Sequence, residues 1–225
     1  AKAASSAVSC EPATPDDEAI VARILAGELQ AFELIMRRYN QRLFRVARGI
    51  VGNDDETEDV LQETYVRAFE HLRQFAGRAK FSTWLTRIAI HEALARRKQR
   101  GRMRAVDFAA AENHDLLPRN PAPAAEQQAS HQELGERLTA AIDRLPSAMR
   151  VVFTMRMIEN MDTREAACCL GLTEANVKVR LHRARALLRE SLGAEFESEV
   201  RSVYQFGGTR CNRIVLAVFA RLDFS

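Results

Sequence analysis

Residues 161–190 read MDTREAACCLGLTEANVKVRLHRARALLRE and predict two helices joined by a short turn. Asp162, followed three residues later by Glu165, forms a pattern typical of a capping box, in which Glu165 reaches back to the cap. Gly171 should end the first helix, because glycine readily adopts the left-handed conformation that closes helices. Thr173 then caps a second helix. These signals together predict a helix-turn-helix unit.

The second predicted helix has one apolar face and one basic face. Its apolar stripe consists of Val177, Leu181, Ala184 and Leu188. The opposite face carries Lys178, Val179, His182, Arg183, Ala186 and Arg189, with Arg180 and Arg185 on its flanks. Such a helix can lie in a DNA major groove, with basic side chains on phosphates and residues near its start on base edges. A solvated arginine-rich face and a protein-binding helical hairpin are the alternatives, and the capped partner helix favours DNA.

Composition and charge indicate a soluble globular chain of one large or two small domains. The 225 residues are 47% hydrophobic and 28% charged, and the formal net charge is only +3. The charge is unevenly distributed, since residues 96–104 and 178–189 are basic whereas residues 54–63 are acidic. Surfaces of opposite charge suggest different partners.

No motif for a metal, a cofactor or catalysis is present in the sequence. Cys10, Cys168, Cys169 and Cys211 have neither C-x-x-C spacing nor a histidine pattern that would complete a zinc site. We expect Cys168 and Cys169 to be reduced, buried residues of a helix. The string His91-Glu92-Ala93-Leu94-Ala95 begins like a zinc-protease motif but lacks the second histidine. We therefore expect no enzyme and no cofactor.

No targeting or membrane segment is expected either. Residues 1–17 lack the apolar stretch of a secretory signal and are predicted to be a disordered lead-in. The longest apolar run, residues 214–220, is far shorter than the roughly twenty residues that span a bilayer. These features predict a cytoplasmic protein.

Helical periodicity dominates the chain and predicts an all-α fold of two small helical domains joined by a flexible linker. Apolar positions from Phe32 to Ile50 predict one long helix that stops at Gly52-Asn53, and an acidic helix begins at Asp54. The predicted divisions are a lead-in at 1–17, a first domain at 18–105, a linker at 106–130, a second domain at 131–192 and a C-terminal extension at 193–225.

Two blocks of this sequence match one known family in the family's own order. Residues 54–100 read DDETEDVLQETYVRAFEHLRQFAGRAKFSTWLTRIAIHEALARRKQR, and residues 145–190 read LPSAMRVVFTMRMIENMDTREAACCLGLTEANVKVRLHRARALLRE. They resemble regions 2 and 4 of the extracytoplasmic-function (ECF) sigma factors, members of the sigma-70 family of bacterial RNA polymerase. The resemblance implies a sigma factor that binds core polymerase, recognises minus-ten and minus-thirty-five promoter elements and initiates transcription of a specific regulon.

By this resemblance, the acidic helix binds the clamp helices of the largest polymerase subunit, and the polymerase flap is a second contact. The residues implied are Asp55, Glu58, Asp59, Gln62, Glu63 and Arg67. Acidic and amide side chains can pair with basic residues of a coiled coil. A merely solvated acidic helix is the alternative. An anti-sigma factor is a further expected partner, which the sequence does not identify.

The resemblance also assigns the two DNA-binding segments. The minus-ten residues are Lys80, Phe81, Ser82, Thr83, Trp84, Arg87, His91 and Arg97. Aromatic faces there can stack on exposed bases, although Phe81 and Trp84 can equally be core residues. His91 stands where the family commonly has asparagine, which bears on base preference. The minus-thirty-five residues are Glu174, Lys178, Val179, His182, Arg183 and Arg185.

The C-terminal extension carries an amphipathic stripe of Ile214, Val218 and Leu222 and needs a surface to bury it. We expect it to pack on region 2 or region 4, and autoinhibition is the alternative, suggested also by Cys211 beside Arg210 and Arg213. A conventional helix-turn-helix regulator that binds operator DNA without polymerase is the main rival function. A protein that only regulates another factor is less suited to two basic helices.

Overall fold

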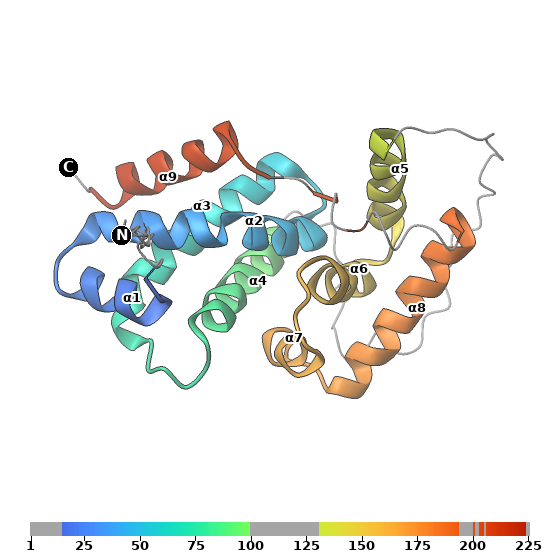
Figure 1. Ribbon diagram of the computed structural model, residues 1–225, viewed down its shortest axis with the longest axis horizontal. Helices are drawn as coiled ribbons and strands as arrows, with labels where there is room; N and C mark the ends of the chain where they lie inside the picture. Colours follow the sequence, from blue (N-terminus) through green and yellow to red (C-terminus); the bar gives the residue numbers. More distant parts are fainter. Residues whose placement is uncertain (1–14, 100–130, 194–199, 201–202, 205, 224–225) are drawn as a thin grey trace, which may run out of the picture.

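The helices form two groups and a C-terminal helix that returns to the first group (Figure 1). The computed structural model describes residues 15–99, 131–193, 200, 203–204 and 206–223, so the predicted linker and most of the predicted lead-in lie outside the described residues. The first group contains α1 (Asp17–Leu25), η1 (Leu29–Ala31), α2 (Phe32–Val51), α3 (Asp54–Glu70), η2 (Leu72–Gln74) and α4 (Phe81–Gln99). The second contains α5 (His131–Arg144), α6 (Ser147–Phe153), the π-helical turn η4 (Thr154–Ile158), α7 (Thr163–Leu170) and α8 (Glu174–Leu192), and α9 spans Thr209–Arg221. Every element of the described part is helical, which confirms the predicted all-α fold.

Helices α2 and α3 meet at the predicted turn. Gly52 ends α2 in the left-handed region, with φ of 84°, where a side chain would be strained. Asn53 then caps α3 by accepting a hydrogen bond from the Glu56 amide at 3.0 Å. This tight turn fixes α3 antiparallel against α2 and sets the position of the acidic helix.

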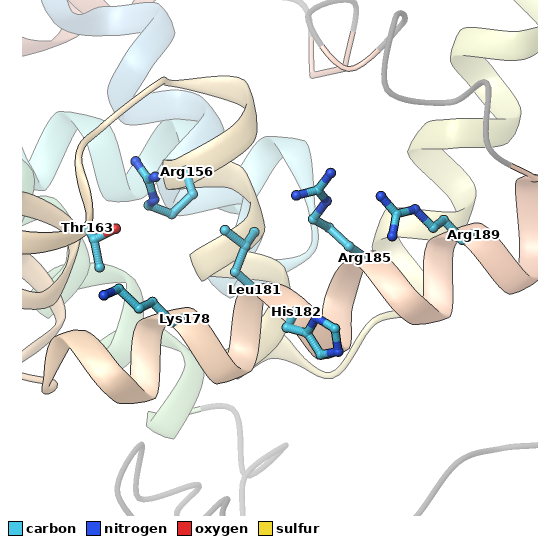
Figure 2. Close-up of a pocket in the computed structure, with 7 residues that line it drawn as sticks. All are labelled: Arg156, Thr163, Lys178, Leu181, His182, Arg185 and Arg189. Atoms are coloured by element: carbon cyan, nitrogen blue, oxygen red, sulfur yellow. The ribbon is translucent and has the colours of Figure 1, made fainter.

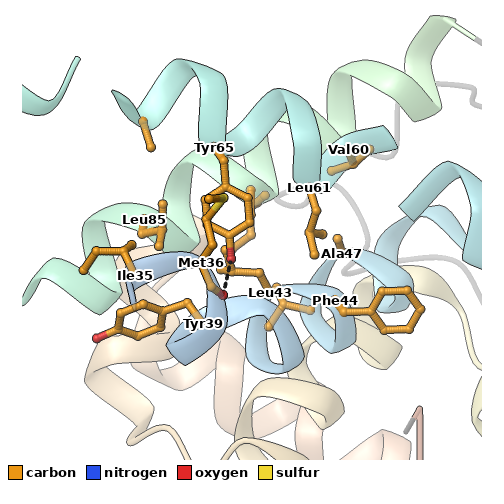
Figure 3. Close-up of a cluster of buried hydrophobic side chains, with 14 of the residues drawn as sticks. Ile35, Met36, Tyr39, Leu43, Phe44, Ala47, Val60, Leu61, Tyr65 and Leu85 are labelled. Atoms are coloured by element: carbon orange, nitrogen blue, oxygen red, sulfur yellow. Dashed lines mark hydrogen bonds between the residues drawn. The ribbon is translucent and has the colours of Figure 1, made fainter. Parts of the chain in front are cut away.

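The core of the first group lies between α2, α3 and α4 (Figure 3). Leu43, Leu61 and Tyr65 are completely buried there. The Tyr65 hydroxyl donates a hydrogen bond to the Met36 carbonyl oxygen at 3.3 Å, so this buried hydroxyl has a partner. Because the apolar side of α3 is buried in this core, its acidic residues face outward or toward α9.

The helix-turn-helix has the predicted caps. The Asp162 carboxylate accepts a hydrogen bond from the Glu165 amide at 2.7 Å, and Gly171 ends α7 with φ of 66°. The Thr173 hydroxyl accepts from the Asn176 amide at 3.2 Å and begins α8. The sequence prediction of both helices and their turn is confirmed.

The two groups pack directly on one another, α2 against α6 and α4 against α7, and one apolar cluster extends across both groups, while a second cluster lies around α5, α6 and α8. Gly49 of α2 allows this approach, because a Cβ at that position would lie 3.3 Å from the Thr154 hydroxyl. Cys169 of α7 is buried in the shared core, as predicted. The prediction was wrong for Cys168, which is exposed because α7 turns that side to solvent.

Candidate nucleic-acid and protein interfaces

Helix α8 presents the predicted basic face to solvent. Val177, Ala184 and Leu188 of its apolar stripe are buried, and Leu181 is partly buried. The exposed residues of α8 include Glu174, Lys178, Val179, His182, Arg183, Ala186 and Arg189. Arg180, which we expected on a flank, is only 6% exposed, because it lies on the packed side of the helix. Packing therefore leaves the basic side of α8 as the side available to a ligand.

A hollow of about 220 Å³ lies beside this basic face (Figure 2). Its lining comes from three elements and consists of Arg156, Thr163, Lys178, Leu181, His182, Arg185 and Arg189. Basic side chains and a hydroxyl around a shallow hollow suit an anionic group such as a backbone phosphate. Three of the predicted DNA residues, Lys178, His182 and Arg185, are brought together here, whereas Glu174, Val179 and Arg183 are not part of the lining.

Sequence reasoning missed Arg156, which faces this hollow from η4. A π-helical turn inserts extra residues per turn, so the spacing of three and four that identifies a helix face no longer applies there. The sequence shows that position 156 is basic, but it does not show that the Arg156 side chain faces the same side as the basic residues of α8.

The acidic residues of α3 lie in two different surroundings. Four of the predicted residues, Asp59, Gln62, Glu63 and Arg67, line a hollow of about 440 Å³. Glu92, Ala95, Arg96 and Gln99 of α4, Val60 of α3 and Arg221 of α9 complete the lining. Asp55 is exposed, whereas Glu58 is only 5% exposed, beside α9. The predicted polymerase residues are therefore partly accessible and partly covered.

Ion pairs connect the walls of this second hollow. Arg67 lies 3.1 Å from the carboxylates of both Glu63 and Glu92, and Arg96 pairs with Asp59. Burial raises the pKa of the Glu92 carboxyl above its usual range. The hydrogen bond from Arg221 is the main cause that holds the pKa of Glu63 below its usual range. The carboxylates that line this hollow are thus already paired with arginines of the same chain. Basic side chains of another protein could replace those arginines as their partners.

The predicted minus-ten segment at the start of α4 is largely buried. Phe81 is 3% exposed, and its ring centroid lies 5.3 Å from that of Phe75 and 5.4 Å from that of Trp84. Phe81 is therefore a core residue in this arrangement, and Trp84 is half-buried at the edge of the same aromatic cluster. The remaining residues divide into Lys80, Arg87 and His91, which are exposed, Ser82 and Thr83, which are buried, and Arg97, which is half-buried against α2.

Helix α7 covers the start of α4. One carboxylate oxygen of Glu165 accepts hydrogen bonds from the Thr83 hydroxyl at 3.0 Å and from Arg42 at 2.9 Å. We expected this side chain to reach back to its own helix cap, but it points toward α4 and α2 instead. Desolvation by burial raises the pKa of the Cys169 thiol, which lies 3.8 Å from the Thr83 carbonyl, to about 12. The predicted minus-ten segment is therefore in contact with α7, the first helix of the helix-turn-helix, whereas the predicted minus-thirty-five residues lie on the second helix, α8.

None of the described helices is both long and apolar enough to cross a membrane. Across residues 15–99 and the other described ranges, His, Cys, Asp and Glu side chains do not gather in a group of three or more that could hold a metal ion.

Comparisons with known proteins agree with the two helical groups. The family model of sigma-70 region 2 matches residues 35–103, and that of sigma-70 region 4 matches residues 135–188. The ECF RNA polymerase sigma factor SigX of Bacillus subtilis is 30% identical over 165 residues, which cover 72% of this chain and 84% of SigX. This chain belongs to the ECF sigma factors of the sigma-70 family. Sigma factor SigE of Mycolicibacterium smegmatis is 32% identical over 171 residues, which span 76% of this sigma factor but only 65% of SigE.

Solved structures support the same fold for this sigma factor. The structure of CnrH in complex with the cytosolic domain of CnrY has a TM-score of 0.55 and 26% identity, covering 80% of this chain and 98% of that chain. RpoE of Bartonella quintana, solved with the anti-sigma factor NepR, has a TM-score of 0.52 at 20% identity. The match to region 2 includes α3 and α4, and the match to region 4 includes α6 to α8. Helix α9 lies beyond both matches and packs on region 2.

Membership in this family defines the general function. The chain is a transcription initiation factor whose partners are RNA polymerase core and promoter DNA, and the family acts through binding rather than catalysis.

Proposed function

We propose that this sigma factor binds core polymerase with the acidic side of α3 and the adjoining part of α4, and reads promoter DNA with α4 and α8. The observation that supports the DNA assignment best is the basic face of α8, which faces solvent while the opposite stripe is buried. A second basic surface on α4 and a separate acidic surface on α3 suit a protein that joins DNA to another protein.

In the proposed minus-thirty-five complex, α8 lies in the major groove. Lys178, His182 and Arg185 border the basic hollow and would hold backbone phosphates. Val179 and Arg183 are exposed on the adjoining side, where arginine can donate two hydrogen bonds to guanine and valine can contact a thymine methyl group. Glu174, in the first turn, would accept from a cytosine amino group.

In the proposed minus-ten complex, the exposed face of α4 holds the melted strand. Lys80, Arg87 and His91 provide basic or hydrogen-bonding groups, and the half-buried ring of Trp84 provides an edge on which a base can stack. Ser82 and Thr83 could reach DNA only after α7 leaves α4. Binding at this element would therefore require region 4 to move away from region 2.

We further propose that the protein catalyses no reaction of its own and acts in the cytoplasm, together with the polymerase that performs the chemistry. Contact of region 4 with the polymerase flap and control by an anti-sigma factor are part of the same proposal. CnrH, which has a similar fold, was solved in complex with the cytosolic domain of CnrY, and this supports a search for a protein partner of this chain.

Transcription by purified components tests this proposal. The chain, combined with core polymerase and a library of promoter fragments, should initiate RNA synthesis from a subset that the core alone does not use. A conventional helix-turn-helix regulator would bind duplex DNA without core and would not direct initiation. Absence of any complex with core, for both the full chain and a variant with α9 released, would refute the assignment.

A further inference from the structure

Helix α9 is attached to α3 through arginine and carboxylate pairs along its whole length. Arg210 donates to Asp54 at 2.6 Å, and Arg221 donates to Glu63 at 2.8 Å. Between them, Arg213 makes two hydrogen bonds of 2.7 Å to the two carboxylate oxygens of Glu58. Paired bonds of this kind are the strongest geometry between arginine and a carboxylate.

The order of these pairs shows that α9 runs in the same direction as α3 (Figure 1). Arg210 and Arg221 are about three helical turns apart, so both project from the same side of α9. Ile214, Val215 and Val218 are buried between them in the core of region 2. Ile214 and Val218 of the stripe predicted from the sequence are thus buried on region 2, and Leu222 is partly buried against the same core.

The start of α9 depends on this docking. Gly208, which precedes the helix, provides no side-chain cap, and the first turn contains no acidic residue. Two cations, Arg210 and Arg213, lie near the helix start, where the helix dipole disfavours positive charge. The carboxylates of Asp54 and Glu58 offset that charge. Released from α3, α9 should therefore lose much of its helix, because a short isolated helix with an unfavourable start is unstable.

The carboxylates that hold α9 include residues assigned to polymerase. Glu58 and Glu63 belong to the proposed core-binding set, and both are engaged by α9 arginines. Glu58 is 5% exposed, so a basic residue of another protein could reach it only after Arg213 moves away. A helix that presents arginines to this face reproduces the kind of charge that the proposed core contact needs.

We propose that α9 is an intramolecular competitor of core polymerase, bound to the same carboxylates of α3. This inference rests on the proposed use of α3 in core binding. When α9 is docked on α3, it covers Glu58, and its Arg221 occupies one wall of the hollow that contains Glu63. Core polymerase gains full access to these carboxylates when α9 is displaced. A tethered competitor acts at a high effective concentration, so even weak contacts can lower the apparent affinity for core.

Two features make the contact reversible. The side chains of Arg213 and Arg221 are 60% and 44% exposed, so their ion pairs are weakened by salt. The tail is also held upstream of α9, where the Tyr204 hydroxyl donates to Asp143 at 2.6 Å and Phe206 stacks on Phe44. Helix α9 can therefore leave α3 while this upstream anchor keeps it nearby.

A reversible disulfide gives the sharpest test. The Asn40 side-chain amide of α2 lies 3.1 Å from the Cys211 sulfur of α9, so Asn40→Cys places a second thiol beside Cys211. Cys10→Ser and Cys168→Ser remove other reactive thiols from this variant. Oxidation should lock α9 in place and lower the affinity for core polymerase by about tenfold or more, and reduction should restore it within the same folded protein.

Charge reversal is the second arm. Arg210→Glu combined with Arg213→Glu should release α9 and raise the affinity for core by about tenfold, whereas Arg144→Glu, on the exposed side of α5, should not. Equal core binding by the locked, reduced and charge-reversed proteins would refute the proposal that α9 competes with core polymerase. The proposed function would remain intact. Failure of every variant to bind core would instead refute the proposed function, and the inference with it.

Discussion

Thr83 of α4 donates a hydrogen bond to Glu165 of α7 over 3.0 Å, which joins the segment assigned to the minus-ten element to the first helix of the helix-turn-helix. Elements named for positions minus ten and minus thirty-five are about 25 base pairs apart, or roughly 85 Å at 3.4 Å per base pair. While α4 is packed against the helix-turn-helix, α4 and α8 cannot reach both elements at once. Under the proposed assignment, this arrangement is a closed state, and binding to both promoter elements would require regions 2 and 4 to separate.

Replacing Glu165 should favour that separation. Glu165→Ala removes the acceptor of Thr83 and Arg42 but keeps the cap of α7, since that bond uses the Glu165 backbone amide. Cys169 is the reporter, because burial raises its pKa to about 12 and leaves little reactive thiolate at neutral pH. Thiol labelling followed by mass spectrometry should show faster modification of Cys169 in Glu165→Ala than in the unaltered protein.

The exposed Cys168 provides an internal reference in the same labelling experiment. Glu136→Ala, on the exposed side of α5, is the matched control and should leave Cys169 protected. If Cys169 of the unaltered protein reacted as fast as Cys168, regions 2 and 4 would not be docked in solution.

Local features of this fold could be predicted because their signals lie within a few residues of one another. Asp162, Gly171 and Thr173 specify the helix-turn-helix, and Gly52 and Asn53 specify the α2–α3 turn. The same kind of signal is present for α1, a helix that the sequence prediction omitted. Asp16 caps that helix, accepting from the Ala19 amide at 2.7 Å, and Ile20, Val21 and Ile24 form its buried stripe.

The docking of the two regions could not be predicted in the same way. It depends on residues far apart in the sequence, such as Gly49 against Thr154 and Thr83 against Glu165, and their spacing carries no periodic signal. The place of α9 was open for the same reason. Its apolar stripe predicted that it must pack, but the sequence does not show which surface receives that stripe or which carboxylates pair with its arginines.

Trp84 should act in promoter opening rather than in the first docking step. Its ring is half-buried beside Phe75 and Phe81, so one edge remains for a displaced base. Trp84→Ala should weaken binding of single-stranded minus-ten DNA by about 1–3 kcal/mol, the usual contribution of one stacked base. Permanganate footprinting of open complexes and gel shifts of closed complexes measure the two steps separately. Trp84→Phe keeps an aromatic ring and should retain most of the single-strand binding. Equal losses at both steps would contradict this role.

Arg183 and Lys178 should differ in what they contribute to minus-thirty-five binding. Arg183 is exposed outside the basic hollow and is assigned to a base edge, whereas Lys178 lines the hollow and is assigned to a phosphate. Arg183→Ala should cost about 1–3 kcal/mol on the specific duplex and reduce discrimination against mismatched duplexes. Lys178→Ala should weaken all duplexes alike and reduce the salt slope by about one. Salt titrations on matched and scrambled duplexes distinguish these results, and an identical profile for both variants would refute the division.

The contact of Arg221 with Glu63 should make the docking of α9 dependent on pH. Glu63 faces Arg67 on its own helix, Glu92 on α4 and Arg221 on α9, and the Arg221 hydrogen bond is the first cause of its lowered pKa. A carboxyl whose pKa is depressed below its ordinary value of 4.5 stabilises the docked state above that pH. The contribution is lost as the pH falls below 4.5 and through the depressed pKa.

Thermal melting of the full chain and of Arg221→Gln measures this contribution. The difference in melting temperature should be constant and small near neutral pH, since the pair is partly exposed and such pairs contribute less than about 1 kcal/mol. It should shrink toward zero as the pH falls below 4.5, because a protonated Glu63 no longer gains from the arginine. Glu136→Gln is the control for general acid effects, since its side chain lies on exposed α5. A difference that stays unchanged down to pH of about 3 would show that Arg221 stabilises the protein through packing rather than through the charge of Glu63.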